Sequence, residues 1–262
     1  IYPNNELVIA HGNGPQVGMI NLAMEYASQG GANTPAMPFP ECGAMTQGYI
    51  GYHLQQAIGR ELNKRHLNRE CVTVVTQVVV DKNDKAFENP TKPIGAFYSE
   101  EDAKAIMAEK GYIFKEDAGR GWRRVVPSPK PVRIVELDVV EKLTEAGFVT
   151  VTVGGGGIPV VESDDGYEGV ASVIDKDRAS SKLALDLHAD MLVILTAVDR
   201  VCINFIKPDQ KALAEMTVAE AKQYISEGHF APGSMLPKVE ACLEYVENTE
   251  NGQALITSLE KA

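Results

Sequence analysis

Short apolar segments rich in β-branched residues alternate along the chain with longer segments whose apolar positions repeat at helical spacing. The short segments predict strands at 7–10, 72–80, 149–153, 191–196 and 254–257. The longer ones predict helices at 16–29, 44–66, 136–146, 179–187, 218–227 and 236–248. This alternation is typical of βα units on a mostly parallel sheet, so we expect an α/β fold. Asp177 is the expected N-cap of the fourth helix, and Gly147 is expected to end the third.

Residues 84–133 interrupt this alternation. A short helix is expected at 100–109, and the residues after it, YIFKEDAGRGWRRVVPSPKPVRIV, mix charge, glycine and proline with Val and Ile. Such a mixture favours a small β-rich excursion from the main sheet, with the character of a lid. No linker or repeat divides the chain, so we expect one domain over 1–262 that contains this subdomain.

Charge and composition narrow the classes of partner. The formal net charge is −11 and the pI is near 5.0, which disfavours nucleic acid and anionic lipid, so a phosphorylated ligand would need local cationic groups. Neither a CxxC pair nor an HExxH-like cluster occurs, so the sequence indicates no disulfide scaffold and no metal site. No apolar run approaches the roughly 20 residues that span a bilayer, and the first residues lack a basic segment followed by an apolar one. We therefore expect a cytoplasmic protein without a membrane partner.

Two glycine-rich turns follow predicted strands. The first is HGNGPQVG, with Gly12, Asn13 and Gly14 between a strand and a helix, where backbone N–H groups and the helix N-terminus favour an anion. The second is GGGGIPV, in which four consecutive glycines end a strand: Gly154, Gly155, Gly156 and Gly157. Such a run is entropically costly, which favours close approach of the backbone to a ligand. The alternatives are a tight turn without a ligand for the first and a bulge or hinge for the second.

Three lysines have unusual local settings. Lys92 lies between Pro90 and Pro93, Lys176 follows Asp175 in VIDKD, and Lys238 lies in GSMLPKV where a helix begins. Any one of them alone is more simply a solvated surface charge. Together, however, they supply the localised positive charge that phosphoryl transfer needs, because that reaction is catalysed mainly by positioning and electrostatic stabilisation. A carboxylate such as Asp175 would hold an ammonium group in place.

The remaining chemistry-bearing segments are less specific. DAGRGWRRVV brings three arginines close to the sole tryptophan, where stacking without function is as good an interpretation as anion binding. MLVILTAVDRVCINF predicts a buried strand and then a loop with Thr196, Asp199 and Asn204. Such a loop lies at the carboxyl end of the sheet, where open α/β folds bind ligands. The alternative is a buried strand followed by an ordinary surface turn.

Eight colinear blocks together resemble the carbamate kinases of the amino acid kinase superfamily. The blocks are HGNGPQVG, CGAMTQGYIGY, NPTKPIG, EDAGRGWRRVVPSPKP, GGGGIPV, VIDKD, CINF and HFAPGSMLPKVEA, and the resemblance extends from Leu7 to Ser258. It implies a three-layer αβα sandwich around a mainly parallel sheet, a subdomain protruding over the site, and a homodimer. It also implies the reaction ATP plus carbamate giving ADP plus carbamoyl phosphate, often run toward ATP, with Mg²⁺ accompanying the nucleotide.

The resemblance also implies roles for particular residues. Lys92 corresponds to the lysine that the subdomain delivers to carbamate or its phosphate. Lys176 and Lys238 correspond to the pair that flanks the transferring phosphoryl group, and Asp175 to the carboxylate that orients them. The backbone cradle for carbamoyl phosphate corresponds to Gly12, Asn13, Gly154, Gly155, Gly156 and Gly157, and the nucleotide site to Thr196, Ala197, Val198 and Met235.

In one respect the chain departs from the family pattern. Family members begin with a strand, a Gly-Gly-Asn loop and a helix before the segment that opens this sequence, and they continue beyond its last residues. Two alternatives to a carbamate kinase therefore stay open. One is a related enzyme of the superfamily that acts on another small carboxylate, such as an acylglutamate. The other is a nucleotide-binding homologue with impaired catalysis.

Overall fold

The structure, a computed structural model, describes residues 5–30, 34–117 and 119–261. Residues 1–4, at which a basic leader segment was looked for, and Ala118 of the arginine-rich segment lie outside the described residues. Contacts divide the chain into two compact units, Ile1–Lys176 and Asp177–Ala262. Helices and strands alternate in both units, which confirms the α/β fold expected from the sequence.

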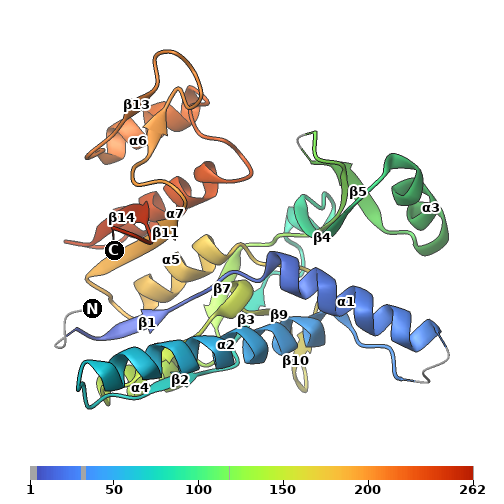
Figure 1. The fold of residues 1–262 in the computed structure, drawn as a ribbon, viewed down its shortest axis with the longest axis horizontal. Helices are drawn as coiled ribbons and strands as arrows, with labels where there is room; N and C mark the ends of the chain where they lie inside the picture. The colour runs from blue at the N-terminus through green and yellow to red at the C-terminus, as the bar shows by residue number, and fades with distance from the viewer. Residues whose placement is uncertain (1–4, 31–33, 118, 262) are drawn as a thin grey trace. The chain divides into compact units, whose positions relative to one another are not determined.

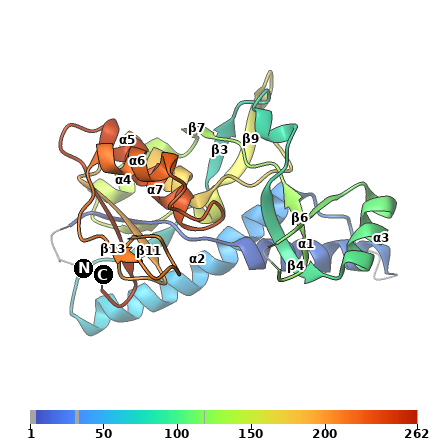
Figure 2. The same ribbon diagram turned by 90° about the horizontal axis from the view of Figure 1, so that it is seen from above.

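The first unit contains a parallel sheet of three strands in the order β1, β8, β2 (Figure 1). These strands are β1 (Leu7–Ile9), β8 (Val149–Val151) and β2 (Cys71–Thr73), and β8 pairs in parallel with both neighbours. The β8 strand is buried along its whole length, as expected for the central strand of a sheet that is covered on both faces. Helices α2 (Phe39–Lys64) and α4 (Leu137–Glu145) provide that cover from opposite sides (Figure 2).

A second sheet continues the first unit beyond a break in two of these strands. Its order is β10 (Gly166–Gly169), β9 (Ile158–Ser163), β3 (Gln77–Val80) and β7 (Pro131–Ile134), with β3 and β9 parallel. The single strand expected at 72–80 is therefore wrong, because residues 74–76 separate β2 from β3. The break lies beside the glycine run that separates β8 from β9, so both parallel strands are interrupted at the same level.

Two helices of the first unit begin earlier than their apolar periodicity suggested. Helix α1 spans Gly14–Gln29, and α2 starts at Phe39 rather than at residue 44; each has a proline in its first two positions. Proline fits there because the N–H groups of the first turn have no intrahelical acceptor. Gly147 has φ 89° after α4, which confirms the expected left-handed residue at the end of this helix.

The excursion expected between residues 84 and 133 is a three-stranded antiparallel sheet in the order β4, β6, β5. Strands β4 (Lys92–Tyr98), β6 (Trp122–Val126) and β5 (Ile113–Glu116) are accompanied by α3 (Glu100–Lys110) and by the short 3₁₀ helix η1 (Lys85–Phe87). Two arginines of β6 stack on aromatic rings other than Trp122. The Arg124 guanidinium lies 3.5 Å from the Tyr112 ring centroid, and that of Arg123 lies 5.1 Å from the Phe97 centroid. These side chains therefore stabilise the small sheet.

Helix α1 packs against β4 through two glycines. A methyl group at Gly18 would overlap the backbone of Gly95, and Gly95 itself has φ +70°, which a residue with a side chain rarely adopts. The Arg124 Nη1 group also donates to Asn21 Oδ1 of α1 at 2.9 Å. The strand that starts with Lys92 is therefore held directly on the helix that starts with the first glycine turn.

The second unit is built on a parallel pair, β11 (Met191–Thr196) and β14 (Gln253–Ser258). Helices α5 (Lys176–Asp186), α6 (Val218–Ser226) and α7 (Met235–Glu247) and the short hairpin β12 (Cys202–Ile203) and β13 (Lys211–Ala212) complete it. Its core contains Ala184, Leu192, Ile194, Ala241 and Tyr245. None of the described helices is both long and apolar enough to cross a membrane.

Helix α5 begins three residues before the predicted start. Lys176 is its first residue, and Asp177 lies in the first turn instead of at the N-cap. A carboxylate in the first turn is stabilised by the partial positive charge of the helix N-terminus, which accounts for an acidic residue there. The shift places Asp175, Lys176 and Asp177 at the point where the two units join.

We predict that Gly18→Ala destabilises the protein, because the added methyl group must displace the Gly95 backbone. The expected loss is about 1–3 kcal/mol in the free energy of unfolding, measured by urea denaturation. Gly59→Ala in α2 is the matched control, because open space surrounds Gly59 and alanine is the better helix former. Equal stability of Gly18→Ala and wild type would contradict the packing of α1 on β4.

Candidate functional site

The glycine run connects β8 to β9 through a tightly bent backbone. Val153 has φ 43° although it is β-branched and fully buried, and Gly155, Gly156 and Gly157 have φ of 68°, 99° and 84°. Left-handed backbone at a β-branched residue is unfavourable by about 1–3 kcal/mol, and it persists only where the surroundings impose it. The bend is therefore an enforced feature of this part of the chain.

Each of the four glycines lies against a specific neighbour that leaves no room for a side chain. A methyl group would overlap the His11 ring at Gly154, the Asn13 amide at Gly155, the Ile174 carbonyl at Gly156 and the Val78 side chain at Gly157. Two of these neighbours belong to the first glycine turn. The two turns predicted from the sequence are therefore brought together, and each fills the space that the other leaves.

Hydrogen bonds hold the two turns in register. The Gly155 N–H donates to the His11 carbonyl at 2.7 Å, and the Asn13 side chain donates Nδ2–H to Thr46 Oγ1 of α2 at 2.9 Å. Asn13 is the N-cap residue of α1, yet its side chain accepts no hydrogen bond from that helix. The N–H groups of the first turn of α1 therefore lack intrahelical acceptors and suit an anion.

The N–H groups of the glycine run are already used. Those of Gly155, Gly156 and Gly157 donate to the carbonyls of His11, Val153 and Gly154 at 2.7, 2.9 and 3.1 Å. The glycine run therefore lets a ligand come close to the backbone, but these three N–H groups are not free to donate hydrogen bonds to it. Among the described residues of the two turns, the start of α1 is the better source of donors.

Lys176 extends along the first turn. A methyl group at Gly12 would lie 3.0 Å from Lys176 Cδ, so the aliphatic part of the lysine passes where a side chain at position 12 would otherwise be. The structure thus brings together Gly12, Asn13, the glycine run and Lys176 within the first unit. A side chain at position 12 would therefore require the Lys176 side chain to shift.

A buried cluster of polar side chains forms hydrogen bonds next to the glycine run. Gln47 of α2 is only 1% exposed; its Nε2 donates to the Thr76 carbonyl at 3.1 Å, and its Oε1 accepts from the Thr76 N–H at 2.7 Å. Thr76 Oγ1 lies 2.7 Å from Thr152 Oγ1 and accepts from the Val153 N–H at 3.1 Å. The Gln47 side chain therefore takes the place of a strand partner at the break between β2 and β3. Sequence analysis did not predict a role for Gln47. The signal that could have indicated one is a glutamine on a largely uncharged stretch of helix.

Lys92, the first residue of β4, donates a hydrogen bond from Nζ to Asp175 Oδ2. The Asp175 side chain is 9% exposed and the Lys92 side chain 32%, so the pair is buried on the carboxylate side. The ammonium group that faces the carboxylate compensates for the water that the carboxylate loses on burial. The sequence did not predict this contact, because the resemblance assigned Asp175 to Lys176 and Lys238 and not to Lys92.

Lys238 is paired with a different carboxylate from the one expected. Its Nζ donates to Asp177 Oδ2 at 2.8 Å within the second unit, and the two side chains are only 11% and 6% exposed. Sequence reasoning assigned Asp177 a capping role and missed this contact. Burial and, to a smaller extent, the negative charge of Asp177 raise the pKa of the nearby Cys242 thiol to about 12, although the positive charge of Lys238 opposes the shift. The thiol is therefore neutral at ordinary pH.

A cavity of about 1450 Å³ lies in the second unit. Ala197 and Val198, at the end of β11, line it, together with residues of the β12–β13 hairpin, α6 and α7. Thr196 and Met235 do not line it. Thr196 is the last residue of β11, and Met235 packs as the first residue of α7 against a cluster that contains Val201 and Phe230.

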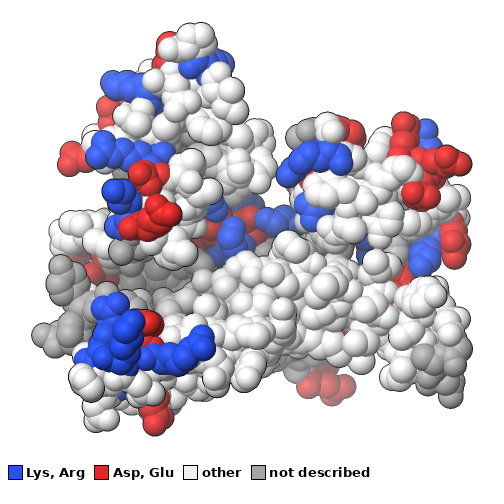
Figure 3. Space-filling view, in the orientation of Figure 1, with Lys and Arg blue, Asp and Glu red and all other residues white. Residues whose placement is uncertain are grey.

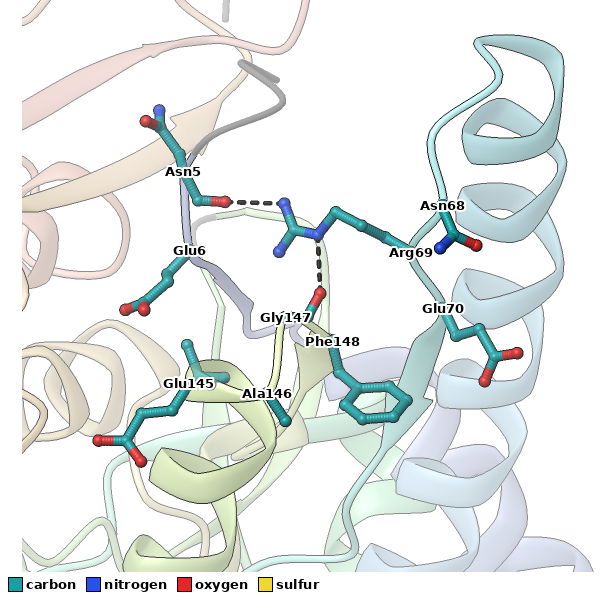
Figure 4. Close-up of a pocket in the computed structure, with 10 residues that line it drawn as sticks. Asn5, Glu6, Asn68, Arg69, Glu70, Glu145, Ala146, Gly147 and Phe148 are labelled. Atoms are coloured by element: carbon teal, nitrogen blue, oxygen red, sulfur yellow. Dashed lines mark hydrogen bonds between the residues drawn. The ribbon is translucent and has the colours of Figure 1, made fainter.

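A smaller cavity of about 420 Å³ lies at the other end of the three-stranded sheet (Figure 4). Arg69 crosses it, donating Nε–H to the Gly147 carbonyl at 2.8 Å and Nη1–H to the Asn5 carbonyl at 2.7 Å. Glu6, Glu70 and Glu145 also line this cavity. Its residues precede the strands, whereas both glycine turns follow them. The geometry indicates that Arg69 braces the backbone here, and the three carboxylates disfavour an anion.

Comparison with known proteins places this geometry in a family. The model of the amino acid kinase family matches residues 2–258, and the chain belongs to that family. Within it, the chain is 57% identical over 255 residues to a carbamate kinase of Staphylococcus haemolyticus, an alignment that covers 97% of this chain and 82% of that protein. It is 56% identical over 262 residues to a carbamate kinase of Clostridium perfringens, with coverage of 100% and 83%.

Solved structures agree with these sequence relatives. A carbamate kinase from Giardia lamblia bound to AMP-PNP superposes with a TM-score of 0.88 at 46% identity, covering 99% of this chain and 81% of that one. The same enzyme bound to citric acid gives a TM-score of 0.90 at 45% identity, covering 99% and 81%. The family resemblance and the fold class expected from the sequence are thereby confirmed.

His11 provides a pH test of the interlocked turns. Its Nδ1 lies 3.0 Å from the Gly12 carbonyl, so Nδ1 carries the proton, and its buried Nε2 has no hydrogen-bond partner among the described residues. Burial lowers the pKa of His11, while the hydrogen bond to Gly12 opposes this shift. Since the unfolded chain takes up a proton near pH 6.5, stability is complete above that pH and falls as the pH drops toward the lowered folded pKa.

We predict that His11→Gln flattens this decline, because glutamine does not titrate. The free energy of unfolding of wild type is expected to fall between pH 7.5 and 5 more steeply than that of the variant, by about 1.4 kcal/mol per unit of pKa difference. Urea denaturation across this pH range gives the comparison, with the exposed His53→Gln as the control. Identical pH profiles for His11→Gln and wild type would refute the assignment.

Proposed function

We propose that this chain is a carbamate kinase, which transfers a phosphoryl group between carbamoyl phosphate and ADP and runs toward ATP. The observation that carries the proposal is the joint packing of the Gly12–Asn13 turn, the glycine run and the Lys176 side chain. Such a site gathers backbone donors and a positive charge, which is what a migrating phosphoryl group requires. The identity of 55–57% to carbamate kinases supports carbamate as the acceptor.

We assign separate roles in binding and catalysis to backbone N–H groups and to the three lysines. N–H groups at Gly12, Asn13 and the start of α1 hold the phosphate of carbamoyl phosphate, and the glycine run lets it approach the backbone. Lys176 and Lys238 stabilise the charge that spreads over the phosphoryl oxygens in the transition state. Lys92 binds the carbamate end, and Asp175 keeps its ammonium group in place. Asp177 does the same for Lys238.

The nucleotide is assigned to the cavity of the second unit. Ala197 and Val198 on its wall support this part of the sequence prediction. Thr196 is proposed to act from the end of the same strand, and Met235 through the packing of α7.

Mg²⁺ fits this chain as a companion of the nucleotide. The described residues contain no group of three or more His, Cys, Asp or Glu side chains able to hold a metal ion. A Mg²⁺ ion that keeps its waters and binds phosphate oxygens needs no such group. When bound, it would neutralise phosphate charge, while the lysines hold the transferring group.

A second copy of the chain is proposed to bind over α1 and α2. Figure 3 shows a broad uncharged surface there, and these two helices carry large exposed apolar side chains: Met19, Leu22, Tyr26, Tyr49 and Tyr52. An exposed apolar area of this kind marks an interaction site. We infer a homodimer, and its solution mass by light scattering is the test.

The free cysteines and the use of ADP fit action in the cytoplasm.

The direct test of the proposed reaction is ATP formation from ADP, Mg²⁺ and carbamoyl phosphate, followed by a coupled assay. Acetyl phosphate replaces carbamoyl phosphate as the phosphoryl donor in this assay, and acylglutamate replaces carbamate as the acceptor in the reverse direction with ATP, because a related enzyme would prefer its own carboxylate. Turnover with carbamoyl phosphate well above the other compounds is expected. ADP binding without any turnover would instead favour a nucleotide-binding homologue.

We predict that Lys176→Ala lowers kcat by about 10²–10³-fold while the Kd for ADP changes by less than about 3-fold. The reason is that its charge is needed mainly in the transition state. Steady-state kinetics and calorimetry measure the two quantities. Lys182→Ala, on the same helix, is the control because Lys182 pairs locally with Asp186. Equal losses in kcat and ADP affinity would argue against this role.

We predict that Lys92→Ala raises the KM for carbamoyl phosphate by about 10–100-fold, the value of one charged hydrogen bond. The KM for ADP should stay nearly constant. Lys115→Ala on the neighbouring strand β5 is the control, because it removes an exposed ammonium group of the same subdomain. An unchanged KM for carbamoyl phosphate in Lys92→Ala would refute the assignment.

A further inference from the structure

We propose that Thr46 is a positioning residue for the phosphate of carbamoyl phosphate: it holds the Asn13 side chain away from α1 and so leaves the first N–H groups of that helix to the phosphate. This inference rests on the proposed function, because it takes the start of α1 as part of the phosphate site. Thr46 lies on α2 and is fully buried, and Asn13 is only 7% exposed. Water therefore has little access to the hydrogen bond between them.

The Thr46 hydroxyl can only accept a hydrogen bond from Asn13. Its O–H donates to the Gly43 carbonyl of α2 at 2.6 Å, so Oγ1 has only lone pairs to offer to another group. Asn13 Nδ2 donates to this oxygen at 2.9 Å. The oxygen end of the Asn13 amide could not replace Nδ2 there, because two acceptors would then face each other. Thr46 therefore fixes which way round the Asn13 amide lies.

The glycine run holds the same amide from another side. A Cβ atom at position 155 would lie 2.2 Å from Asn13 Nδ2, 2.3 Å from its Cγ and 2.7 Å from its Oδ1. Because these three distances are so similar, the flat face of the amide rests on the Gly155 backbone. The amide is thus held at one edge by Thr46 and on one face by Gly155, and in this place it accepts no hydrogen bond from α1.

An asparagine in this position would ordinarily cap its own helix. An N-cap residue usually has extended backbone, and its side-chain oxygen accepts from the N–H group two or three residues further on. Pro15 has no N–H group, so the Gln16 N–H is the one that Asn13 would take. Instead, Asn13 has ψ 11°, which is not extended, and it makes no such bond. Thr46 thus keeps a residue that favours capping from doing so.

The consequence is a helix N-terminus that stays open to a ligand. If Asn13 capped α1, a phosphate would have to displace the amide oxygen from the Gln16 N–H before it could bind there. Removal of the Thr46 hydroxyl would also leave the buried Asn13 Nδ2 without its acceptor, which is unfavourable and promotes movement of the side chain. Loss of this hydroxyl is therefore expected to weaken phosphate binding while the nucleotide site stays unaffected.

The test compares Thr46→Val, which keeps the shape of the side chain, with Thr46→Ser, which keeps the hydroxyl. In the coupled assay we expect Thr46→Val to raise the KM for carbamoyl phosphate by about 3–30-fold, the strength of one capping hydrogen bond. The KM for ADP and kcat should stay within about 2-fold of wild type. Thr46→Ser should restore the KM for carbamoyl phosphate.

Thr144→Val on α4 is the matched control. The Thr144 hydroxyl is also buried and donates to a carbonyl of its own helix, that of Val140, at 2.8 Å, but it holds no other side chain among the described residues. This variant therefore removes the same chemical group from a helix without releasing a partner. Both KM values should stay close to those of wild type.

Two further measurements separate capping by Asn13 from a general loosening of the site. Asn13→Ala removes the amide, so the addition of Thr46→Val to it should raise the KM for carbamoyl phosphate by less than about 2-fold. Hydrogen exchange followed by NMR observes the Gln16 N–H directly, and this group should exchange more slowly in Thr46→Val than in wild type. Thr46→Ala takes the place of Thr46→Val in both measurements if the valine variant does not fold.

The outcomes distinguish the inference from the proposed function. A wild-type KM for carbamoyl phosphate in Thr46→Val would overturn the inference and leave the proposed function intact. The same conclusion follows if the KM for ADP rises equally, if the rise is as large in the Asn13→Ala background, or if exchange of the Gln16 N–H is unchanged. Absence of turnover in wild type would overturn the proposed function, and the inference with it.

Discussion

Two backbone turns that are far apart in the sequence fill each other's space, and the geometry of the first unit depends on this contact. His11 and Asn13 occupy the volumes that side chains at positions 154 and 155 would need, and the Gly155 N–H closes the contact on the His11 carbonyl. A larger residue at position 154 or 155 would separate the turns, and one at position 156 or 157 would overlap Ile174 or Val78. The entropic cost of such a run is offset by the order that it creates at the site.

Positive charge in this acidic chain is held by buried carboxylates. Asp175 and Asp177 flank Lys176, and they pair with Lys92 and Lys238 respectively. An ammonium group hydrogen-bonded to a buried carboxylate is held in one direction, whereas the ammonium group of a flexible surface lysine is not. Each pair lies within one compact unit: Lys92 with Asp175 in the first, and Lys238 with Asp177 in the second. Phosphoryl transfer depends on this kind of preorganisation.

Sequence reasoning reached the fold class, most helices and the residues of the glycine turns, because these leave local signals. The pairing of Lys92 with Asp175 was not predicted from spacing, since it joins residues 83 positions apart. The roles of Gln47 and Asp177 were missed for a related reason. Each is an ordinary polar residue on a helix, and only tertiary packing shows that one replaces a strand partner and the other holds Lys238. The split of strand 72–80 was missed because its apolar residues continue through the break.

A double-mutant cycle between Asn13→Ala and Gly155→Ala tests the interlocked turns most directly. Asn13→Ala removes the amide that a methyl group at position 155 would strike, so Gly155→Ala should cost less stability in that background than in wild type. The account predicts a coupling free energy of at least about 1 kcal/mol from urea denaturation, with the left-handed backbone at Gly155 keeping the rescue partial. Strict additivity of the two changes would contradict it.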